Sequence, residues 1–280
     1  TSSVKAGVHR IAQYIHLLSN TSTKRPLDVW TPSTNNIEPQ ISNQVALGYF
    51  KNLKDNQYEF TAEVYYKSMS HLVDYIDGAD LLLNEFLEGD LLVGKGRAYG
   101  LELMLKKNKG KFNGWLSYTL ARSERLVEGV SKDEWYPSRF DQTHNLSITA
   151  FYEAGKRWTL SANYVYVTGS PNTFPTSTYT IQEYEAIHNG LNTRNNIRIP
   201  DYHRLDFGAT LKGKDKPNKK WKNEWVFSVY NIYNRRNPFS IYFRPEESRP
   251  VVGQPIDFEA IRLSVIGSFV PSITWNFKFN

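Results

Sequence analysis

Apolar and polar side chains alternate along much of this chain with a period of two residues. The closing stretch SITWNFKF shows the pattern most clearly, because Ile273, Trp275, Phe277 and Phe279 alternate with polar residues. Successive side chains of a β-strand point to opposite faces of the sheet, so each such stretch predicts a strand with one apolar face and one polar face. The same alternation recurs upstream at residues 58–67, 99–106, 145–152, 158–164, 205–211 and 225–229.

The alternation, together with the turn residues between the segments, predicts about ten strands. They are expected near residues 3–18, 40–53, 57–72, 97–107, 111–123, 142–153, 157–168, 201–212, 222–234 and 262–279. The polar face of these strands carries charged residues that would look into a lumen, namely Glu59, Glu63, Glu102, Lys106 and Lys278.

The connections between the predicted strands alternate strictly between short and long. The short links are 54–57, 108–110, 154–156 and 213–221, and the long ones are 19–39, 73–96, 124–141, 169–200 and 235–261. In an up-and-down barrel alternate connections lie at opposite rims, and outer-membrane barrels have short periplasmic turns and long extracellular loops. The sequence therefore predicts an all-β, transmembrane, antiparallel up-and-down β-barrel with a periplasmic C-terminus. A soluble sandwich gives no reason for this order, because its Greek-key links mix lengths at both ends.

Composition agrees with a barrel better than with a helical membrane protein. The mean hydropathy is -0.53, and the longest apolar runs, such as residues 81–83, are far shorter than the roughly 20 residues of a membrane helix. The 18 Tyr, 15 Phe and 7 Trp are typical of a protein whose rings line two membrane interfaces. Cysteine is absent, which excludes disulfides and thiolate metal sites. The net charge of +6 is scattered, so no nucleic-acid partner is predicted.

No pattern in the chain predicts a catalytic residue, a cofactor or a metal site. The histidines are His9, His16, His71, His144, His188 and His203, and no pair has the helical spacing of a zinc site with a general base between. His144 and His203 are expected to be polar residues at the extracellular ends of strands. Gly94, Gly96 and Gly100 lack the spacing of a phosphate-binding loop and are interpreted as providing loop flexibility.

Aromatic and arginine residues in the predicted outer loops are the candidates for substrate contact. The aromatic ones are Trp30, Trp135, Tyr136, Tyr184 and Tyr242, and the cationic ones are Arg139, Arg194 and Arg244. Rings in such loops can stack on an incoming sugar or peptide, and guanidinium groups can hold an anion. The competing interpretation is that these side chains pack one loop against another.

Several stretches resemble the barrel of TonB-dependent receptors of Bacteroidota, the type with an N-terminal carboxypeptidase-regulatory-like domain. They include PLDVWTPSTNNIEPQISNQVALGYF, RAYGLELMLKKNKGKFNGWLSYTLARSER, IPDYHRLDFGATL and VPSITWNFKF, and together they span nearly the whole chain in order. The resemblance implies that residues 1–280 are the last ten or so strands of a 22-stranded barrel in the outer-membrane lipid. The plug, pulled by the TonB complex, would lie outside these residues.

The resemblance also implies a role in active nutrient uptake, with a glycan, a peptide or a metal chelate as cargo. The barrel-assembly machinery would recognise a C-terminal signal at Trp275, Phe277 and Phe279, although Asn280 follows where the family usually ends in an aromatic residue. A surface lipoprotein partner is compatible with the family, but no residue points to it. The alternatives are a passive porin, a complete ten-stranded barrel enzyme of the omptin type, and a structural fragment held by an assembly complex.

Overall fold

The computed structural model describes residues 1–19, 28–77, 79, 81, 84–174, 177–181, 184–188, 193–214, 221–245 and 258–279. Within these residues the helical segments are two short 3-10 turns, η1 (Leu87–Asp90) and η2 (Ser131–Asp133). No helix in that part of the chain has the length and apolarity to cross a bilayer. The rest of the regular structure is β-sheet.

Ten long strands form one antiparallel sheet in which each strand pairs with the next along the chain. They are β1 (Ser2–Gln13), β4 (Gln40–Leu53), β5 (Tyr58–Tyr75), β6 (Leu91–Lys107), β7 (Phe112–Val127), β9 (His144–Glu153), β10 (Trp158–Val167), β15 (Tyr202–Lys212), β16 (Trp221–Tyr230) and β19 (Val270–Phe279). The ten strands predicted from the alternation are therefore confirmed in number, order and direction.

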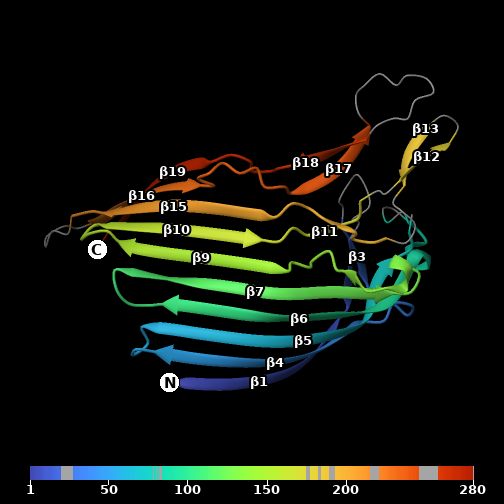
Figure 1. Ribbon diagram of the computed structural model, residues 1–280, viewed down its shortest axis with the longest axis horizontal. Coiled ribbons are helices and arrows are strands. Elements are labelled where there is room, and N and C mark those ends of the chain that lie inside the picture. The colour runs from blue at the N-terminus through green and yellow to red at the C-terminus, as the bar shows by residue number, and fades with distance from the viewer. Residues whose placement is uncertain are drawn as a thin grey trace.

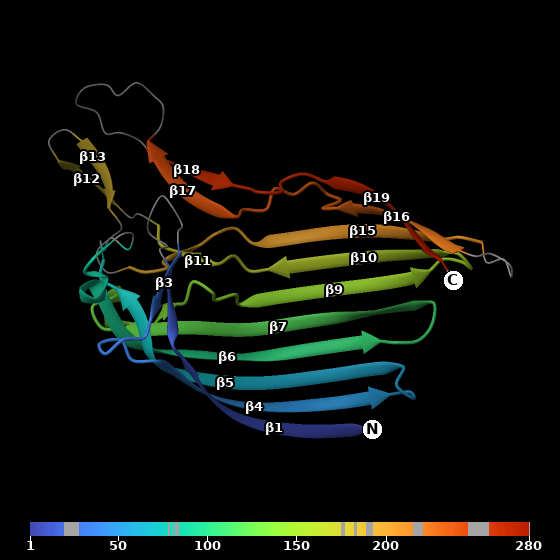
Figure 2. The same cartoon turned by 180° about the vertical axis from the view of Figure 1, so that it is seen from behind.

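The remaining short strands lie in the long connections. They are β2 (Ile15–Ser19), β3 (Asp28–Pro32), β8 (Tyr136–Pro137), β11 (Pro171–Asn172), β12 (Ser177–Ile181), β13 (Tyr184–His188), β14 (Ile197–Arg198), β17 (Ser240–Pro245) and β18 (Phe258–Leu263). Figures 1 and 2 show these short strands gathered at one end of the sheet, while both chain termini lie at the other. All long connections therefore share one rim, here called the long-loop rim, and the short turns share the opposite short-turn rim.

The predicted boundaries are wrong in several places, and in two of them the strand was predicted to continue into what is a separate element. The segment predicted at 3–18 divides after Gln13, and β2 pairs with β3 outside the main sheet. The segment predicted at 262–279 also divides, since β18 pairs with β17 and β19 begins only at Val270. The segment predicted at 222–234 ends at Tyr230, because Asn231 has a left-handed backbone with φ of 55°.

The registers of the ten strands separate two faces. In an antiparallel pair, residues that face each other across the ladder have side chains on the same side of the sheet. One row across β4 to β7 is Leu47, Val64, Leu101 and Leu120, and the next row is Gly48, Glu63, Glu102 and Thr119. The predicted lumen residues Glu59, Glu63, Glu102, Lys106 and Lys278 all lie on the polar face.

The apolar face of the sheet has no protein packed against it among the described residues. Val8 is 80% exposed and Ile273 is 68% exposed. The buried hydrophobic clusters lie instead among the long loops, around Leu18 and around Val127. A soluble sandwich would bury this face, so the distribution fits a sheet whose apolar side meets lipid.

Aromatic rings border the apolar face on both sides. Tyr58 and Tyr66 of β5 mark the two borders on one strand, and Tyr66 stacks on Tyr99 of β6 with ring centroids 6.4 Å apart. Near the short-turn rim, Trp225 of β16 stacks on Trp275 of β19 at 5.8 Å. Eight residues span roughly 26 Å of strand, or about 20 Å along the membrane normal at a tilt of about 40°, close to the ~25 Å apolar band of outer-membrane barrels.

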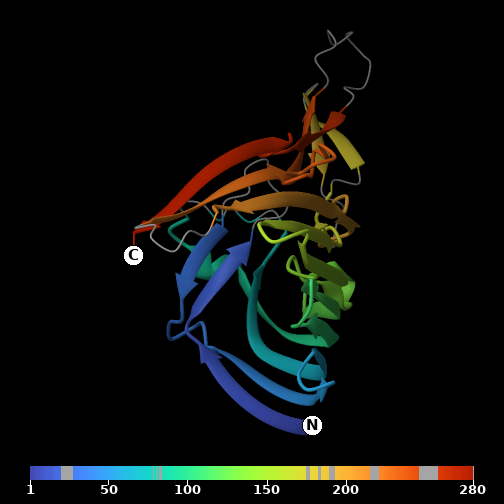
Figure 3. The same cartoon turned by 90° about the vertical axis from the view of Figure 1, so that its left-hand side faces the viewer.

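The sheet is open, with β1 at one margin and β19 at the other (Figure 3). The complete ten-stranded barrel that the omptin alternative requires is therefore not what the described strands form. In lipid, unpaired N–H and C=O groups along an open edge cost several kcal/mol each, so only a closed cylinder is stable there. The ten strands consequently represent one part of a larger barrel.

Candidate functional site at the long-loop rim

A β-bulge in β5 places an acidic side chain at the long-loop rim. The register between β5 and β6 shifts between Ser70 and Leu72, and His71 at the bulge has a left-handed φ of 56°. Without the extra residue, Asp74 would share the apolar face with Tyr66, because both numbers are even and side chains alternate. The bulge reverses that order and turns Asp74 toward the polar face.

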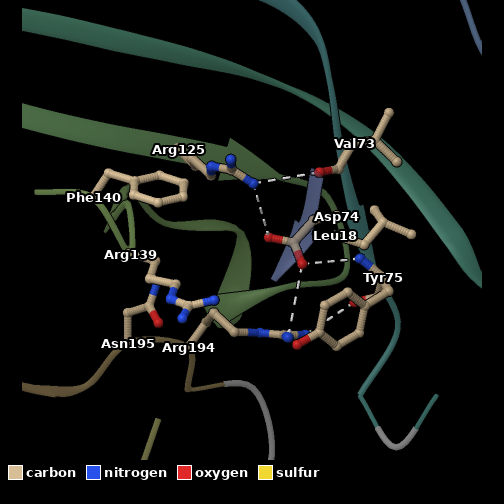
Figure 4. Close-up of a pocket in the computed structure, with 9 residues that line it drawn as sticks. All are labelled: Leu18, Val73, Asp74, Tyr75, Arg125, Arg139, Phe140, Arg194 and Asn195. Atoms are coloured by element: carbon tan, nitrogen blue, oxygen red, sulfur yellow. Dashed lines mark hydrogen bonds and ion pairs between the residues drawn. The ribbon is translucent and has the colours of Figure 1, made fainter. Parts of the chain in front are cut away.

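Asp74 is the centre of a buried polar cluster (Figure 4). Its carboxylate accepts a hydrogen bond from the Tyr136 hydroxyl at 2.7 Å and one from the Tyr75 backbone N–H at 2.9 Å. Two guanidinium groups approach the same carboxylate, those of Arg125 and Arg194, each at 3.7 Å. Burial and, after it, the Asp74 charge raise the pKa of Tyr136 well above its ordinary value, so this loop phenol remains a donor.

Arg194 brings the connection between β10 and β15 into this cluster. Its Nη2 donates to the Tyr75 carbonyl at 2.9 Å and to the Asp77 carboxylate at 3.0 Å, and its guanidinium lies 4.2 Å from the centre of the Tyr75 ring. Its Nε and the neighbouring Asn195 Oδ1 have no hydrogen-bond partner among the described residues. A small cavity of about 20 Å³ adjoins them, which is enough for one water molecule.

A second charged cluster ties the same loops to β6 and β7. Asp141 is fully buried and accepts hydrogen bonds from the Ser123 backbone N–H and from Arg198. Glu124 receives Arg97 at 2.7 Å and Arg122 at 3.1 Å. Three long connections, 76–90, 128–143 and 168–201, are thus held to one another and to the strand ends by buried or half-buried ion pairs.

A hollow of about 440 Å³ opens beside these clusters, above β10, β15 and β16. The side chains that give it its character are Tyr202, Tyr230, Phe239, Val265 and Ile266. Both tyrosine hydroxyls accept hydrogen bonds from Arg204 Nη1, at 2.8 and 2.9 Å. The hollow therefore presents an aromatic and aliphatic surface at the long-loop rim, and the Arg204 guanidinium contacts the two tyrosines that line it.

The candidate residues from the sequence fall into different settings. Tyr136 and Arg194 are buried in the Asp74 cluster, and Arg139 lines the small cavity there. Trp135 lies under the Arg97 guanidinium, 4.1 Å from its centre. Trp30 is apart from them on β3 and is 63% exposed. The geometry of Trp135, Tyr136 and Arg194 favours the interpretation that they pack the loops together.

The other three candidates belong to short strands in the long loops. Tyr184 begins β13, and Tyr242 and Arg244 belong to β17, but their side chains lie outside what the structure describes. No role at this rim was predicted from the sequence for Asp74, Arg125 or Asp141. Asp74 stands inside the apolar run LVDYI, and such an isolated charge could have signalled a buried ion pair.

The two rim histidines have simple partners. His144 begins β9 and forms a hydrogen bond with the Tyr118 hydroxyl at 2.8 Å, and His203 in β15 does the same with Tyr233 at 2.8 Å. No group of three or more potential metal ligands occurs among the described residues.

The interpretation of Gly94, Gly96 and Gly100 as loop residues was wrong. All three lie within β6 on the polar face, where neighbouring strands come close. A Cβ on Gly94 would lie 2.4 Å from the Leu126 carbonyl oxygen, and one on Gly96 would lie 2.3 Å from Leu72 Cδ1. These glycines permit close packing of the curved sheet.

The two-faced, open meander with loops on one rim defines a segment of a transmembrane β-barrel. The particular family follows from comparison: a model described as TonB dependent receptor-like, beta-barrel, matches residues 12–234. The chain therefore belongs to that family. TonB-dependent receptors are outer-membrane β-barrels.

Solved structures agree on the fold at low sequence identity. The FrpB iron transporter from Neisseria meningitidis matches with a TM-score of 0.57 and 11% identity over 99% of this chain and 37% of its own. The ferric-catecholate import receptor Fiu from E. coli K12 matches with a TM-score of 0.53 and 15% identity, over 85% of this chain and 29% of its own. The ferric citrate transporter FecA matches with a TM-score of 0.51 and 13% identity, over 86% of this chain and 31% of its own. The chain thus spans about a third of each. Among curated proteins, none matches it.

Proposed function

We propose that residues 1–280 are the C-terminal part of the barrel of an outer-membrane receptor that imports a nutrient with energy delivered by TonB. The observation that carries the proposal is the exposed apolar face that continues across all ten strands, opposite a polar face lined by charged residues. In lipid such a sheet is stable when it closes around an aqueous interior. Family membership supports TonB as the energy source.

The proposed orientation places the short-turn rim and the C-terminus in the periplasm and the long loops outside. Its support is the segregation of long and short connections to opposite rims. The proposal includes a plug domain and a carboxypeptidase-regulatory-like domain in the full receptor, and an origin in Bacteroidota, on the strength of the sequence resemblance alone.

Ligand recognition is proposed at the long-loop rim. The hollow lined by Tyr202, Tyr230 and Phe239 presents ring faces that suit the flat apolar side of a ligand, and Trp30 adds an exposed ring elsewhere on the rim. The buried charge clusters around Asp74 and Asp141 would hold the loops in place. Cargo of the glycan, peptide or metal-chelate class is compatible with this surface.

The last strand is proposed to carry the signal for barrel assembly. Trp275, Phe277 and Phe279 share the outer face of β19, and all three rings are exposed. Neighbouring rings are in contact, with centroids 5.0 Å apart for Trp275 and Phe277. Since β19 has a free edge in the described sheet, a partner could pair with it and contact these rings at the same time.

Growth of a deletion strain tests the transport proposal. The strain lacking the full-length receptor is supplied with single defined glycans, peptides or iron chelates, and uptake of the limiting one is measured with TonB present and absent. Loss of growth on one nutrient, restored by the full-length receptor only when TonB is present, is the expected result. Restoration that does not need TonB would identify a passive porin instead.

A further inference from the structure

A strongly basic groove occurs at the short-turn rim, away from the loop clusters. It has a volume of about 830 Å³ and is formed where β15 and β19 end and where β10 and β16 begin. Six cationic residues line it: Lys156, Arg157, Lys212, Lys214, Lys222 and Lys278. Glu224 is the acidic residue in its lining. The lining therefore has a formal excess of five positive charges.

The register places Lys212, Lys222, Glu224 and Lys278 on the polar face of the sheet, while Lys156, Arg157 and Lys214 lie at the short turns and Phe277 lines the groove from the apolar face. Lys212 pairs with Glu224, which pairs with Asn276, and one row further along Lys222 pairs with Lys278. The apolar rows of the same strands carry Trp225 and Trp275 on the opposite face. In a closed barrel the groove consequently opens to the interior and the periplasmic mouth, and lipid meets the other side of the wall.

The cations of the groove have no ion-pair partner among the described residues. Arg157 uses its Nε to donate to the Lys212 carbonyl at 2.7 Å, and Glu224 accepts from the Asn276 amide at 3.1 Å. None of the ion pairs in the described part of the chain includes the five groove lysines. Like charges gathered in this way repel one another, so an anionic occupant would be stabilised.

We infer that this groove, termed the basic groove, binds an acidic, extended segment of a periplasmic polypeptide. Four adjacent strands span roughly 14 Å, which matches four or five residues of an extended peptide at about 3.3 Å each. The groove is too large for one phosphate, and the polar-face position of Lys212, Lys222 and Lys278 separates these three lysines from lipid headgroups at the outer wall. The periplasmic location of the partner rests on the orientation proposed above.

The test uses the full-length receptor in detergent and two fluorescent peptides, hexaglutamate and hexaglutamine, with binding followed by anisotropy. The groove variant replaces Lys212, Lys222 and Lys278 by Gln. Its matched control replaces Lys51, Lys109 and Lys111 by Gln, three lysines at or near other short turns of the same rim. Hexaglutamate is expected to bind the parent and the control alike and the groove variant roughly tenfold more weakly. Salt at 0.5 M should weaken parent binding, since screening then acts within a few ångströms.

Equal binding of hexaglutamate and hexaglutamine, or equal loss in both variants, would overturn the inference. So would a soluble short-chain phosphatidylglycerol that binds in a groove-dependent manner where hexaglutamate does not, because the ligand would then be a lipid phosphate. The side of the membrane is tested separately with Lys214→Cys, since these 280 residues contain no cysteine. Labelling by an impermeant maleimide only after the outer membrane is permeabilised supports a periplasmic partner, whereas labelling in intact cells overturns the proposed orientation and leaves the peptide result standing.

Discussion

The replacement Val64→Lys tests most directly whether the apolar face meets lipid. Val64 lies on that face between Leu47 and Leu101 of the neighbouring strands, and it is 48% exposed. In water, changing a half-exposed Val to Lys alters stability by no more than about 0.5 kcal/mol. In a bilayer, a Lys on the lipid face costs about 2–4 kcal/mol at the midplane and less toward the interface. Since Val64 lies two residues from the border ring of Tyr66, a cost of about 2 kcal/mol is expected, or roughly 30-fold in the unfolding equilibrium.

Glu63→Lys provides the matched control, because Glu63 is the adjacent residue on the polar face and lies opposite Glu102. The full-length receptor and both variants are refolded into phosphatidylcholine vesicles, and the denaturant midpoint is measured by gel mobility. The midpoint of Val64→Lys should fall while that of Glu63→Lys stays within error of the parent. Equal midpoints for the two variants would refute the assignment of the faces.

Three further predictions concern the rim and the wall. Asp74→Asn leaves the buried Arg194 guanidinium and the half-buried Arg125 guanidinium with less compensation. It should lower hydrogen-exchange protection of residues 128–143 roughly 100-fold, a cost of about 3 kcal/mol, whereas the exposed Glu134→Gln should not. Gly94→Ala should block barrel assembly, scored as loss of the heat-modifiable gel band, while Gly155→Ala, with open space around it, should assemble normally. Burial lowers the pKa of His16 below its ordinary value of 6.5. The stability that neutral His16 contributes to the fold is therefore fully present above pH 6.5 and is lost as the pH falls through the lowered pKa. Proteolysis of the β2–β3 unit should rise between pH 7 and 5 in the parent, and it should rise less in His16→Gln.

The sheet could be predicted from the sequence because the alternation is a local signal. A strand such as β5 shows its two faces within a few residues, from Tyr58 to Lys67, and needs no distant partner to be recognised. The family resemblance added the larger barrel, which alternation alone left open. Gly94 and Gly96 were wrongly predicted to lie in a loop. A glycine is needed at these positions because β7 and Leu72 come close to them, and a local sequence pattern does not show which strands lie side by side.

The loop clusters could not be predicted, because their contacts join residues far apart in the chain. Asp74 and Arg194 are 120 positions apart, and the side on which Asp74 lies depends on one extra residue at His71. The period of two that identified the strand assigns Asp74 to the apolar face, and only the bulge corrects it. Tyr136 and Arg194 were therefore predicted as candidates for ligand contact, while Asp74, the carboxylate that both of them contact, was not predicted.

The wall and the rim of this molecule are stabilised by different kinds of interaction. The wall has hydrogen-bonded ladders and an apolar face that needs lipid, whereas the rim has its own small cores around Leu18 and Val127 and its buried ion pairs at Asp74 and Asp141. The rim clusters include strand residues, because Val73 belongs to β5 and Val127 to β7, so wall and rim are joined there. The hollow beside Tyr230 is lined in part by Phe239, Val265 and Ile266 of the connection between β16 and β19, so a change in that connection would alter the hollow without replacing residues of these two clusters. Replacements in that connection would therefore change the surface that the hollow offers to a ligand while leaving the apolar face of the strands unaltered.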